Sequence, residues 1–355
     1  MQDLYISMLG AQGTGKSSLL ASMYYTFKKN AGELGFIMKP ASAEDSNQLS
    51  EKHEEMLEHL HGVRGTDNAG TPTEVASEYV LDLGFLKNNI PDYWLKLHFW
   101  DFPGGWLLEN RDAVVEQLNK SDVILIAIDT PSLVVDDKHG NYQLWHEKKN
   151  RPHAIADIFM EIDFSKPKLI LFVPIKCEAW RTSTKGSELI VDQVRKGYDG
   201  LIAALKMYAD VTVATTSVQT LGNYLWNYRI SKTIKNKVTL QDKFIPFNAG
   251  VNGNAEYSPR EIDQPLIYIL SFLAKQVREN LADIQTRTDE RWENQSWWQS
   301  LIKTISGERA EYLQARRALF TKLSQLEHPI DLLNKKRMDS KKDGFEVIQG
   351  RQNLL

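Results

Sequence analysis

The sequence predicts a three-layer α/β fold, in which helices cover both faces of a mainly parallel sheet, followed by a helical C-terminal appendage. Strand patterns alternate with helical patterns along residues 3–280. Two short apolar runs, VILIAI at 123–128 and LILFV at 169–173, are typical of strands that are buried on both faces. After about residue 282 the pattern changes to long helical periodicity without strands, which predicts the appendage.

These patterns divide the chain into three parts. We expect an α/β domain over residues 1–281, a helical region over 282–333 and a charged, flexible tail over 334–355. Apolar residues at helical spacing in the second part favour packing on the α/β domain over binding to a partner or a membrane surface. These residues are Trp298, Leu301, Ile302 and Ile305.

The individual elements follow from periodicity and turn chemistry. The expected strands span residues 3–9, 74–83, 93–101, 122–129, 168–173, 211–216 and 243–247. The expected helices span residues 17–28, 43–61, 108–118, 154–164, 188–208 and 262–279. Residues 130–152 are interpreted as a polar excursion between two of these elements.

Composition excludes several classes of protein. The chain has 355 residues with 43 basic and 46 acidic side chains, so its net charge of −3 provides no strong field for nucleic acid. The single cysteine, Cys177, excludes an internal disulfide and predicts a cytoplasmic protein. No apolar run is long enough to span a bilayer, and the first residues lead directly into a strand without the features of a signal peptide.

The strongest motif lies between the first expected strand and the first expected helix. Residues 10–17, GAQGTGKS, match the pattern G-x-x-x-x-G-K-[ST] at every fixed position. Glycines in such a loop let successive backbone amides surround a phosphate, and the helix that starts there adds its dipole. Lys16 is expected to reach the β- and γ-phosphates, Ser17 to bind Mg²⁺, and Ser18 to contact the α-phosphate.

A second motif, DFPG, ends the alternating strand at residues 93–101. Asp101 at this position is expected to hold Mg²⁺ through water. Gly104 can offer its backbone amide to a γ-phosphate and let the loop move when that phosphate leaves. The order of the two motifs along the chain supports both assignments.

With these two motifs the chain resembles the P-loop GTPases of the translation-factor and Ras-like class. The resemblance covers about residues 3–280 and implies a P-loop NTPase domain with GTP or GDP and Mg²⁺ as ligands. It implies that the loop residues contact the nucleotide, and these are Gly10, Gln12, Gly13, Thr14, Gly15, Lys16, Ser17 and Ser18. The segments TSVQTLG at 216–222 and YSPREIDQPLIYIL at 257–270 resemble a bacterial GTPase group that is associated with conflict or effector systems.

The base-reading motif of this class, N/T-K-x-D, corresponds here to Ile175-Lys176-Cys177-Glu178. Lys176 can lay its aliphatic stem along a purine, and Glu178 can accept from the adjacent N–H groups of guanine. Isoleucine in place of asparagine and glutamate in place of aspartate depart from the pattern, so ATP remains an alternative to GTP as the bound nucleotide. Ser217 and Val218, after the strand at 211–216, are the expected match to the last motif, whose backbone covers the base.

The switch threonine and the catalytic groups are less defined by the sequence. Thr71 and Thr73 both precede the strand that is expected to pair with the Asp101 strand, and either can contact Mg²⁺ and the γ-phosphate. A glutamine that orients water often follows D-x-x-G, but Gly105 and Trp106 occupy those positions here. Turnover is therefore expected to be slow alone, with Arg64 a candidate for an arginine supplied in cis.

Together these patterns predict a guanine-nucleotide switch with slow, Mg²⁺-dependent hydrolysis of GTP. Its expected partner is an effector or activating protein, and homodimerisation is a further option. Two alternatives stay open, an ATP-binding P-loop ATPase and a scaffold that binds nucleotide without hydrolysing it.

Overall fold

The computed structural model of the chain describes residues 2–31, 36–60, 75–87, 90–135, 142–234, 237–247, 255–286 and 345–350. Its strands are β1 (Gln2–Leu9), β2 (Phe36–Pro40), β3 (Ser77–Lys87), β4 (Ile90–Asp101), β5 (Val123–Asp129), β6 (Lys168–Ile175), β7 (Val211–Thr216), β8 (Tyr224–Ile234), β9 (Lys237–Pro246) and β10 (Phe345–Gln349). Its helices are α1 (Lys16–Ala31), α2 (Ala43–Leu60), α3 (Trp106–Glu109), α4 (Arg111–Lys120), α5 (Thr130–Val134), α6 (Tyr142–Asn150), α7 (Pro152–Phe159), α8 (Thr184–Gly197), α9 (Asp199–Leu205) and α10 (Gln264–Thr286).

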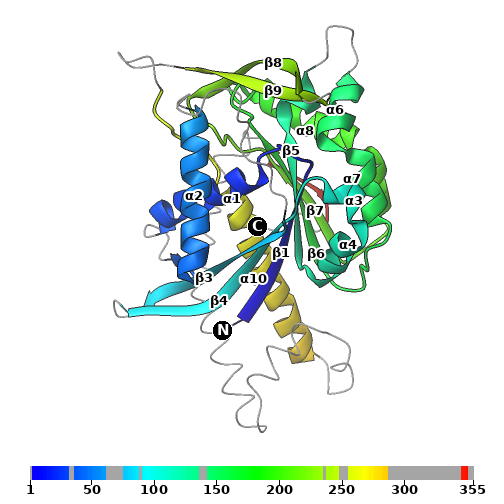
Figure 1. Cartoon of the computed structure of the whole chain (residues 1–355). Helices are drawn as coiled ribbons and strands as arrows, with labels where there is room; N and C mark the ends of the chain where they lie inside the picture. Colours follow the sequence, from blue (N-terminus) through cyan, green and yellow to red (C-terminus); the bar gives the residue numbers. More distant parts are fainter. Residues whose placement is uncertain are drawn as a thin grey trace.

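Within the described residues, one eight-stranded sheet has the order β10-β7-β6-β5-β1-β4-β3-β2. The five central strands, from β7 to β4, run parallel to one another. Strands β3 and β2 at one edge and β10 at the other are antiparallel to their neighbours. The mainly parallel sheet confirms the predicted fold class (Figure 1).

Helices cover both faces of this sheet, so its middle strands β5 and β6 consist mainly of apolar residues. Every residue of β5 and β6 is buried. Because neighbouring residues of a strand point to opposite faces, Leu125 belongs to the core under α1 and α10. Ile124 and Ile126 belong to the other core, under α4, α7, α8 and α9. Figure 1 shows the two helical layers on either side of the sheet.

Helix α2 begins with a reciprocal cap at Ser42. The Ser42 hydroxyl accepts from the Asp45 amide at 3.1 Å, and the Asp45 carboxylate accepts from the Ser42 amide at the same distance. The other Asp45 oxygen accepts from the Val80 amide of β3 at 2.8 Å. The cap therefore also fixes the start of α2 against the sheet.

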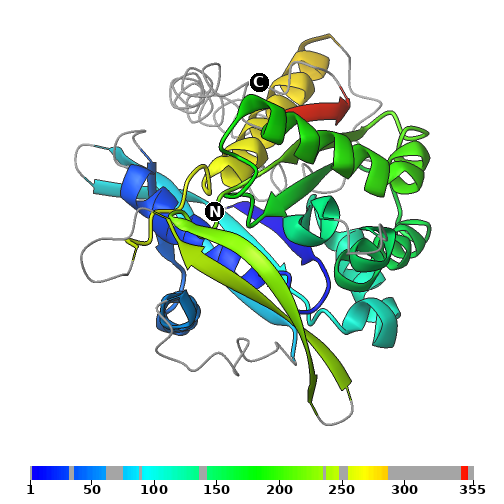
Figure 2. The ribbon, with the colours of Figure 1, turned by 90° about the horizontal axis from the view of Figure 1, so that it is seen from above.

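A hairpin of β8 and β9 forms a second, two-stranded sheet in the described part of the chain. Figures 1 and 2 show this hairpin across the end of the main sheet where β1 and β5 terminate. The sequence predicts only residues 243–247 of this hairpin, because β8 mixes polar and aromatic side chains without a clean alternation. The hairpin places residues near 229 and 242 over the carboxyl ends of the parallel strands.

Other elements also differ from the sequence prediction, and the helix predicted at 188–208 is divided at Tyr198 into α8 and α9. The polar excursion at 130–152 contains two helices, α5 and α6, and the first of these is capped by Asp129, whose carboxylate accepts from the Ser132 amide at 3.2 Å. The helix predicted at 108–118 is divided at Asn110 into α3 and α4. The edge strand β2 was not predicted, and its five residues are too few for a clear period.

The tail predicted to be flexible over 334–355 contains an ordered strand. Residues of β10 pair with β7, Gln349 donates to the carbonyls of Leu205, Tyr208 and Val211 at 2.8–3.2 Å, and Phe345 stacks on Tyr268 with centroids 4.1 Å apart. Helix α10 continues through the predicted boundary between 281 and 282. Residues 287–344, which include most of the predicted helical region, lie outside the described residues. No helix in the described ranges has both the length and the apolar character that spanning a membrane requires.

Candidate functional site

The loop at residues 10–17 connects β1 to α1 and has a backbone that depends on glycine. Gly10, Gly13 and Gly15 have φ angles of 151°, 70° and 107°, in the region that residues with a Cβ rarely adopt. A Cβ on Gly10 would lie 2.9 Å from the Ala127 carbonyl oxygen. The glycines of the motif therefore make the curled loop possible, as the sequence predicts.

Lys16 folds back into this loop. Its ammonium donates to the Gly10 carbonyl at 2.9 Å, and the residue is only 7% exposed. Burial lowers the pKa of Lys16, while the nearby Asp101 carboxylate acts in the opposite direction. Thr14 closes the other side of the loop, since its hydroxyl donates to the Ala11 carbonyl at 2.9 Å. A positive charge is thus held against the backbone of the loop.

Asp101 and Ser17 meet at the edge of the loop, as expected for a magnesium site. The parallel register of β1 and β4 places Asp101 opposite Met8, and the Ser17 hydroxyl donates to the Asp101 carboxylate. Burial raises the pKa of Asp101, and Lys16 and Ser17 oppose that shift. The second Asp101 oxygen is buried and has no hydrogen-bond partner among the described residues.

These oxygens suit Mg²⁺, which binds proteins through one or two carboxylates and takes its other ligands from water and phosphates. No cluster of three or more His, Cys, Asp or Glu residues in the described part of the chain could hold a metal by itself. A divalent ion held by Ser17 and Asp101 would take the rest of its coordination from water and phosphate oxygens. Bound there, it would neutralise charge on those phosphates.

The DFPG loop lies directly on the phosphate loop. A Cβ on Gly104 would be 2.0 Å from the Gln12 amide nitrogen and 2.4 Å from the Ala11 carbonyl carbon. Only glycine permits this approach, because a Cβ at this position would overlap backbone atoms, which cannot move aside as a flexible side chain can. The structure therefore brings Gly104 to the phosphate loop, next to Gln12, as the sequence predicts.

The expected base-reading segment also lies beside the phosphate loop. A Cβ on Gly15 would be 3.1 Å from Ile175 Cδ1 and 3.9 Å from Lys176 Cε. The Lys176 amide donates to the Thr220 hydroxyl at 3.2 Å. Its ammonium donates to the Asp129 carboxylate at 2.7 Å, so the aliphatic stem is held across the end of the sheet.

Ser217 and Val218 lie next to this segment. The Val218 amide donates to the Pro174 carbonyl at 2.9 Å, and both the carbonyl and the hydroxyl of Ser217 accept from Arg181, at 2.6 and 2.8 Å. Both residues are buried. The two predicted base-binding segments are therefore adjacent.

Glu178 has a different set of contacts from the one that the sequence suggested. One carboxylate oxygen accepts from the amides of Leu221 and Gly222, at 2.5 and 3.2 Å, and the residue is 2% exposed. Its other oxygen is buried without a partner among the described residues. In this structure Glu178 fixes the connection between β7 and β8, and its reading of a base stays a prediction.

The burial of Glu178 predicts a pH-dependent stability. Burial raises its pKa to about 7, against the opposing effect of the two amides. Between pH 4.5 and 7 the folded state thus binds more protons than the unfolded state, so the free energy of unfolding falls as pH rises. Glu178→Gln keeps the acceptor oxygen. It is expected to raise the free energy of unfolding at pH 8 by about 2–3 kcal/mol and to flatten the dependence of that free energy on pH, as measured by urea titrations. The exposed Glu188→Gln is the control, and an unchanged profile in Glu178→Gln would contradict the prediction.

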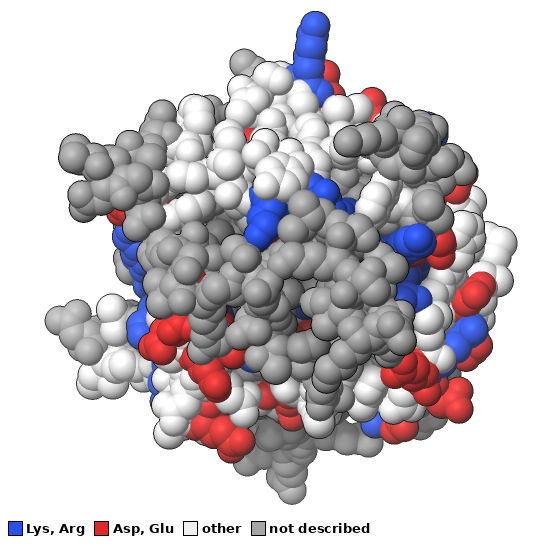
Figure 3. All heavy atoms as spheres, turned by 45° about the horizontal axis from the view of Figure 1, so that its top comes forward, with Lys and Arg blue, Asp and Glu red and all other residues white. Residues whose placement is uncertain are grey.

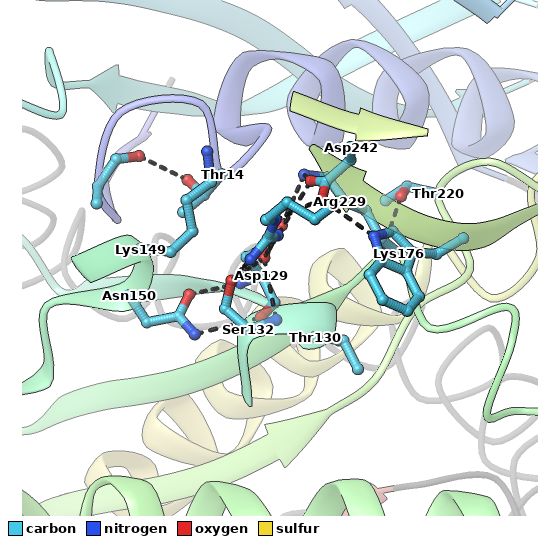
Figure 4. Close-up of polar contacts among 12 residues, drawn as sticks. Thr14, Asp129, Thr130, Ser132, Lys149, Asn150, Lys176, Thr220, Arg229 and Asp242 are labelled. Atoms are coloured by element: carbon cyan, nitrogen blue, oxygen red, sulfur yellow. Dashed lines mark hydrogen bonds and ion pairs between the residues drawn. The ribbon is translucent and has the colours of Figure 1, made fainter. Parts of the chain in front are cut away.

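A buried charge cluster, which the sequence analysis did not predict, lies beside the loop (Figure 4). Arg229 of the hairpin contacts Asp129 at 2.7 Å, Asp242 at 2.7 Å and the Ser132 hydroxyl at 2.6 Å. Lys176 contacts the same two carboxylates at 2.7 and 3.6 Å. Although burial alone raises the pKa of Asp129, Lys176 and Arg229 hold it well below its usual value.

Other predicted site residues are exposed or half-buried, or lie outside the described residues. Gln12 and Gly13 are exposed at the crest of the loop, and Ser18 is half-buried in the first turn of α1. Arg64, Thr71 and Thr73 lie in the segment 61–74, outside the described residues. The antiparallel pairing of Ser77 with Asp101 does confirm that the strand after this segment pairs with the Asp101 strand.

The described surface visible in Figure 3 carries both signs of charge. Figure 3 shows the described basic side chains as separate spots, with acidic side chains between them and along the rim. This mixture agrees with the near-neutral balance of 43 basic and 46 acidic residues.

No protein-family model matches the sequence, and no curated protein matches it. Among solved structures, the chain is similar to two structures of the S. cerevisiae Ski7 GTPase-like domain. The structure bound to GDP and inorganic phosphate is 14% identical with a TM-score of 0.34, and the structure bound to GTP is 15% identical with a TM-score of 0.32. Each match covers 61% of this chain and 43% of the yeast chain, so this chain spans less than half of the yeast chains. A likeness at this distance is too weak to assign a ligand or an activity.

Proposed function

We propose that this chain binds a guanine nucleotide with Mg²⁺, hydrolyses GTP slowly and uses its nucleotide state to control a protein partner. The observation that carries the proposal is the convergence on one loop of Lys16, the Ser17–Asp101 pair and Gly104. A triphosphate needs a cation, amides and a magnesium site together, and these groups supply all three.

Each residue has a distinct part in this proposal. The amides of residues 13–17 surround the phosphates, and the Lys16 ammonium leaves the Gly10 carbonyl to donate to phosphate oxygens. Ser17 and Asp101 hold Mg²⁺. Gly104, which lies on Gln12 in this structure, moves away to admit the γ-phosphate and offers its amide to it. Loss of that phosphate lets the loop return, and this movement is the signal to the partner.

Turnover is expected to be slow because the two residues after Gly104 have no side chain that could orient water. Gly105 has none, and Trp106 packs against the core around Phe102, with ring centroids 6.3 Å apart. Phosphate release by the chain alone is expected below about one per minute. The partner, in the bacterial conflict or effector setting that the resemblance suggests, would raise that rate.

A second candidate is a P-loop protein with weak base selectivity that also accepts ATP. It is favoured by the contacts of Glu178, whose acceptor oxygen is occupied by the amides of Leu221 and Gly222. The carboxylate therefore has one oxygen left for a guanine base, although the two adjacent N–H groups of guanine would otherwise use both.

A competition experiment separates the two candidates. The nucleotide that co-purifies is released by denaturation and identified by mass spectrometry, and a fluorescent GDP analogue is then displaced with GTP or ATP. We expect GTP to displace it at a concentration at least about tenfold lower than ATP, as one charged hydrogen-bond contact to guanine would produce. Equal displacement supports the second candidate. Absence of binding to either nucleotide rejects both.

A further inference from the structure

Lys149 lies at the end of α6, where the helix is fixed to the sheet. The side chain of the next residue, Asn150, is fully buried and bridges to the end of β5. Its Oδ1 accepts from the Asp129 amide at 2.8 Å, and its Nδ2 donates to the Asp129 carbonyl at 3.2 Å. Arg151 then ends the helix with a positive φ of 51°. The backbone of Lys149 is therefore held beside the carboxyl end of β5, close to the phosphate loop.

From this position the Lys149 side chain reaches the crest of the phosphate loop. Its ammonium is 3.5 Å from the Gln12 carbonyl oxygen, and a Cβ on Gly13 would lie 3.0 Å from it. Figure 4 shows Lys149 pointing toward the loop that carries Thr14. Lys149 therefore approaches Gln12 and Gly13, in the loop whose amides are expected to hold phosphate.

Among the residues that the structure describes, this ammonium forms no ion pair. Asp129 and Asp242, whose charges act on it, are themselves paired with Lys176 and Arg229. Burial lowers the pKa of Lys149, while Asp129 opposes the shift. A half-buried lysine whose contact in the described residues is a long one to a carbonyl favours an anionic ligand at the same place.

We propose that Lys149 is a catalytic residue that contacts the terminal phosphates of the bound nucleoside triphosphate and stabilises the charge that develops in hydrolysis. This inference rests on the proposed function. During hydrolysis a water oxygen forms a bond to the γ-phosphorus, and the bond from that phosphorus to the bridging oxygen breaks. The electron pair stays on the β-phosphate, and the water proton passes to the released phosphate. A positive charge supplied from within the chain lowers the barrier to this transfer.

The test compares Lys149→Met with Lys148→Met, the adjacent exposed lysine of the same helix. Single-turnover phosphate release with saturating Mg²⁺–GTP is expected to slow about 10- to 100-fold in Lys149→Met and to remain unchanged in Lys148→Met. The Kd for a non-hydrolysable GTP analogue should change less than the rate does. Lys149→Arg should recover part of the rate, because it restores the charge.

A binding measurement makes the inference independent of how fast the wild type turns over. GDP with aluminium fluoride imitates the planar phosphoryl group in transfer, so the wild type should bind this complex more tightly than GDP alone, and Lys149→Met should lose that gain. Equal rates and equal gains in the wild type and Lys149→Met overturn the role of Lys149 and leave the proposed function standing. A wild type that binds no nucleotide overturns both. Thermal unfolding of each variant shows whether a loss of rate reflects a loss of fold.

Discussion

Replacing Lys16 with alanine is expected to lower the affinity for a magnesium-bound nucleoside triphosphate by about 100-fold or more. The ammonium is buried inside the loop and, among the described residues, donates to the Gly10 carbonyl at 2.9 Å, a neutral acceptor that charged phosphate oxygens can replace. Alanine removes the charge and leaves the glycine backbone, whose conformation does not depend on the side chain. Isothermal titration calorimetry with Mg²⁺ and GTP, and then with ATP, measures the change.

The control for this prediction is Lys29→Ala, which removes an exposed lysine from the last turn of the same helix. It should bind nucleotide as the wild type does. Folding is checked by thermal unfolding without nucleotide, where Lys16→Ala should be no less stable, since a desolvated charge has been removed. Retention of triphosphate affinity within about threefold in Lys16→Ala would show that the loop does not hold phosphates through this lysine.

The parts of the fold that could be predicted are those encoded locally. Strands β5 and β6 are continuous apolar runs because both of their faces are covered, and such runs are visible in any short window of sequence. The phosphate loop is equally local, because Gly10, Gly13 and Gly15 are required by backbone angles within eight residues. Asp101 followed from its place at the end of an alternating strand, and the structure brings it to Ser17.

The charge cluster could not be predicted, because its members are far apart in sequence. Arg229 and Asp129 are 100 residues apart, and nothing near either residue indicates the other. Strand β8 carries Arg229 in a segment of mixed polarity, which gives little signal of a strand. Lys149 belongs to a helix in what the sequence suggested was a polar excursion. The position of Asp129 at the end of a buried strand was the one available signal of a polar site there.

The contacts of Glu178 show the limit of motif reasoning. The sequence places the residue just after the strand that the structure describes as β6. It gives no information on the connection between β7 and β8, whose amides at Leu221 and Gly222 take the carboxylate. A motif thus predicts where a side chain lies more securely than it predicts which partner that side chain binds.

Replacing Arg229 with methionine is expected to lower the free energy of unfolding by about 3–5 kcal/mol. The guanidinium is 8% exposed and contacts Asp129, which is fully buried, and Asp242, which is 9% exposed. Methionine keeps much of the apolar stem but leaves both carboxylates to Lys176, which is 3.6 Å from Asp242. The loss is large because a buried charge without its partner cannot recover its hydration.

Two further variants make this prediction specific to burial. Arg195→Met removes a similar ion pair, with Glu346, whose side chains are 43% and 37% exposed, and it should cost at most about 1 kcal/mol. Arg229→Met combined with Asp242→Asn should recover part of the loss, since one of the two stranded charges is then neutral. Urea unfolding measures all four proteins. If Arg229→Met and Arg195→Met lowered the free energy of unfolding by equally small amounts, the ion pairs of Arg229 would not be what holds the hairpin over the carboxyl ends of β5 and β6.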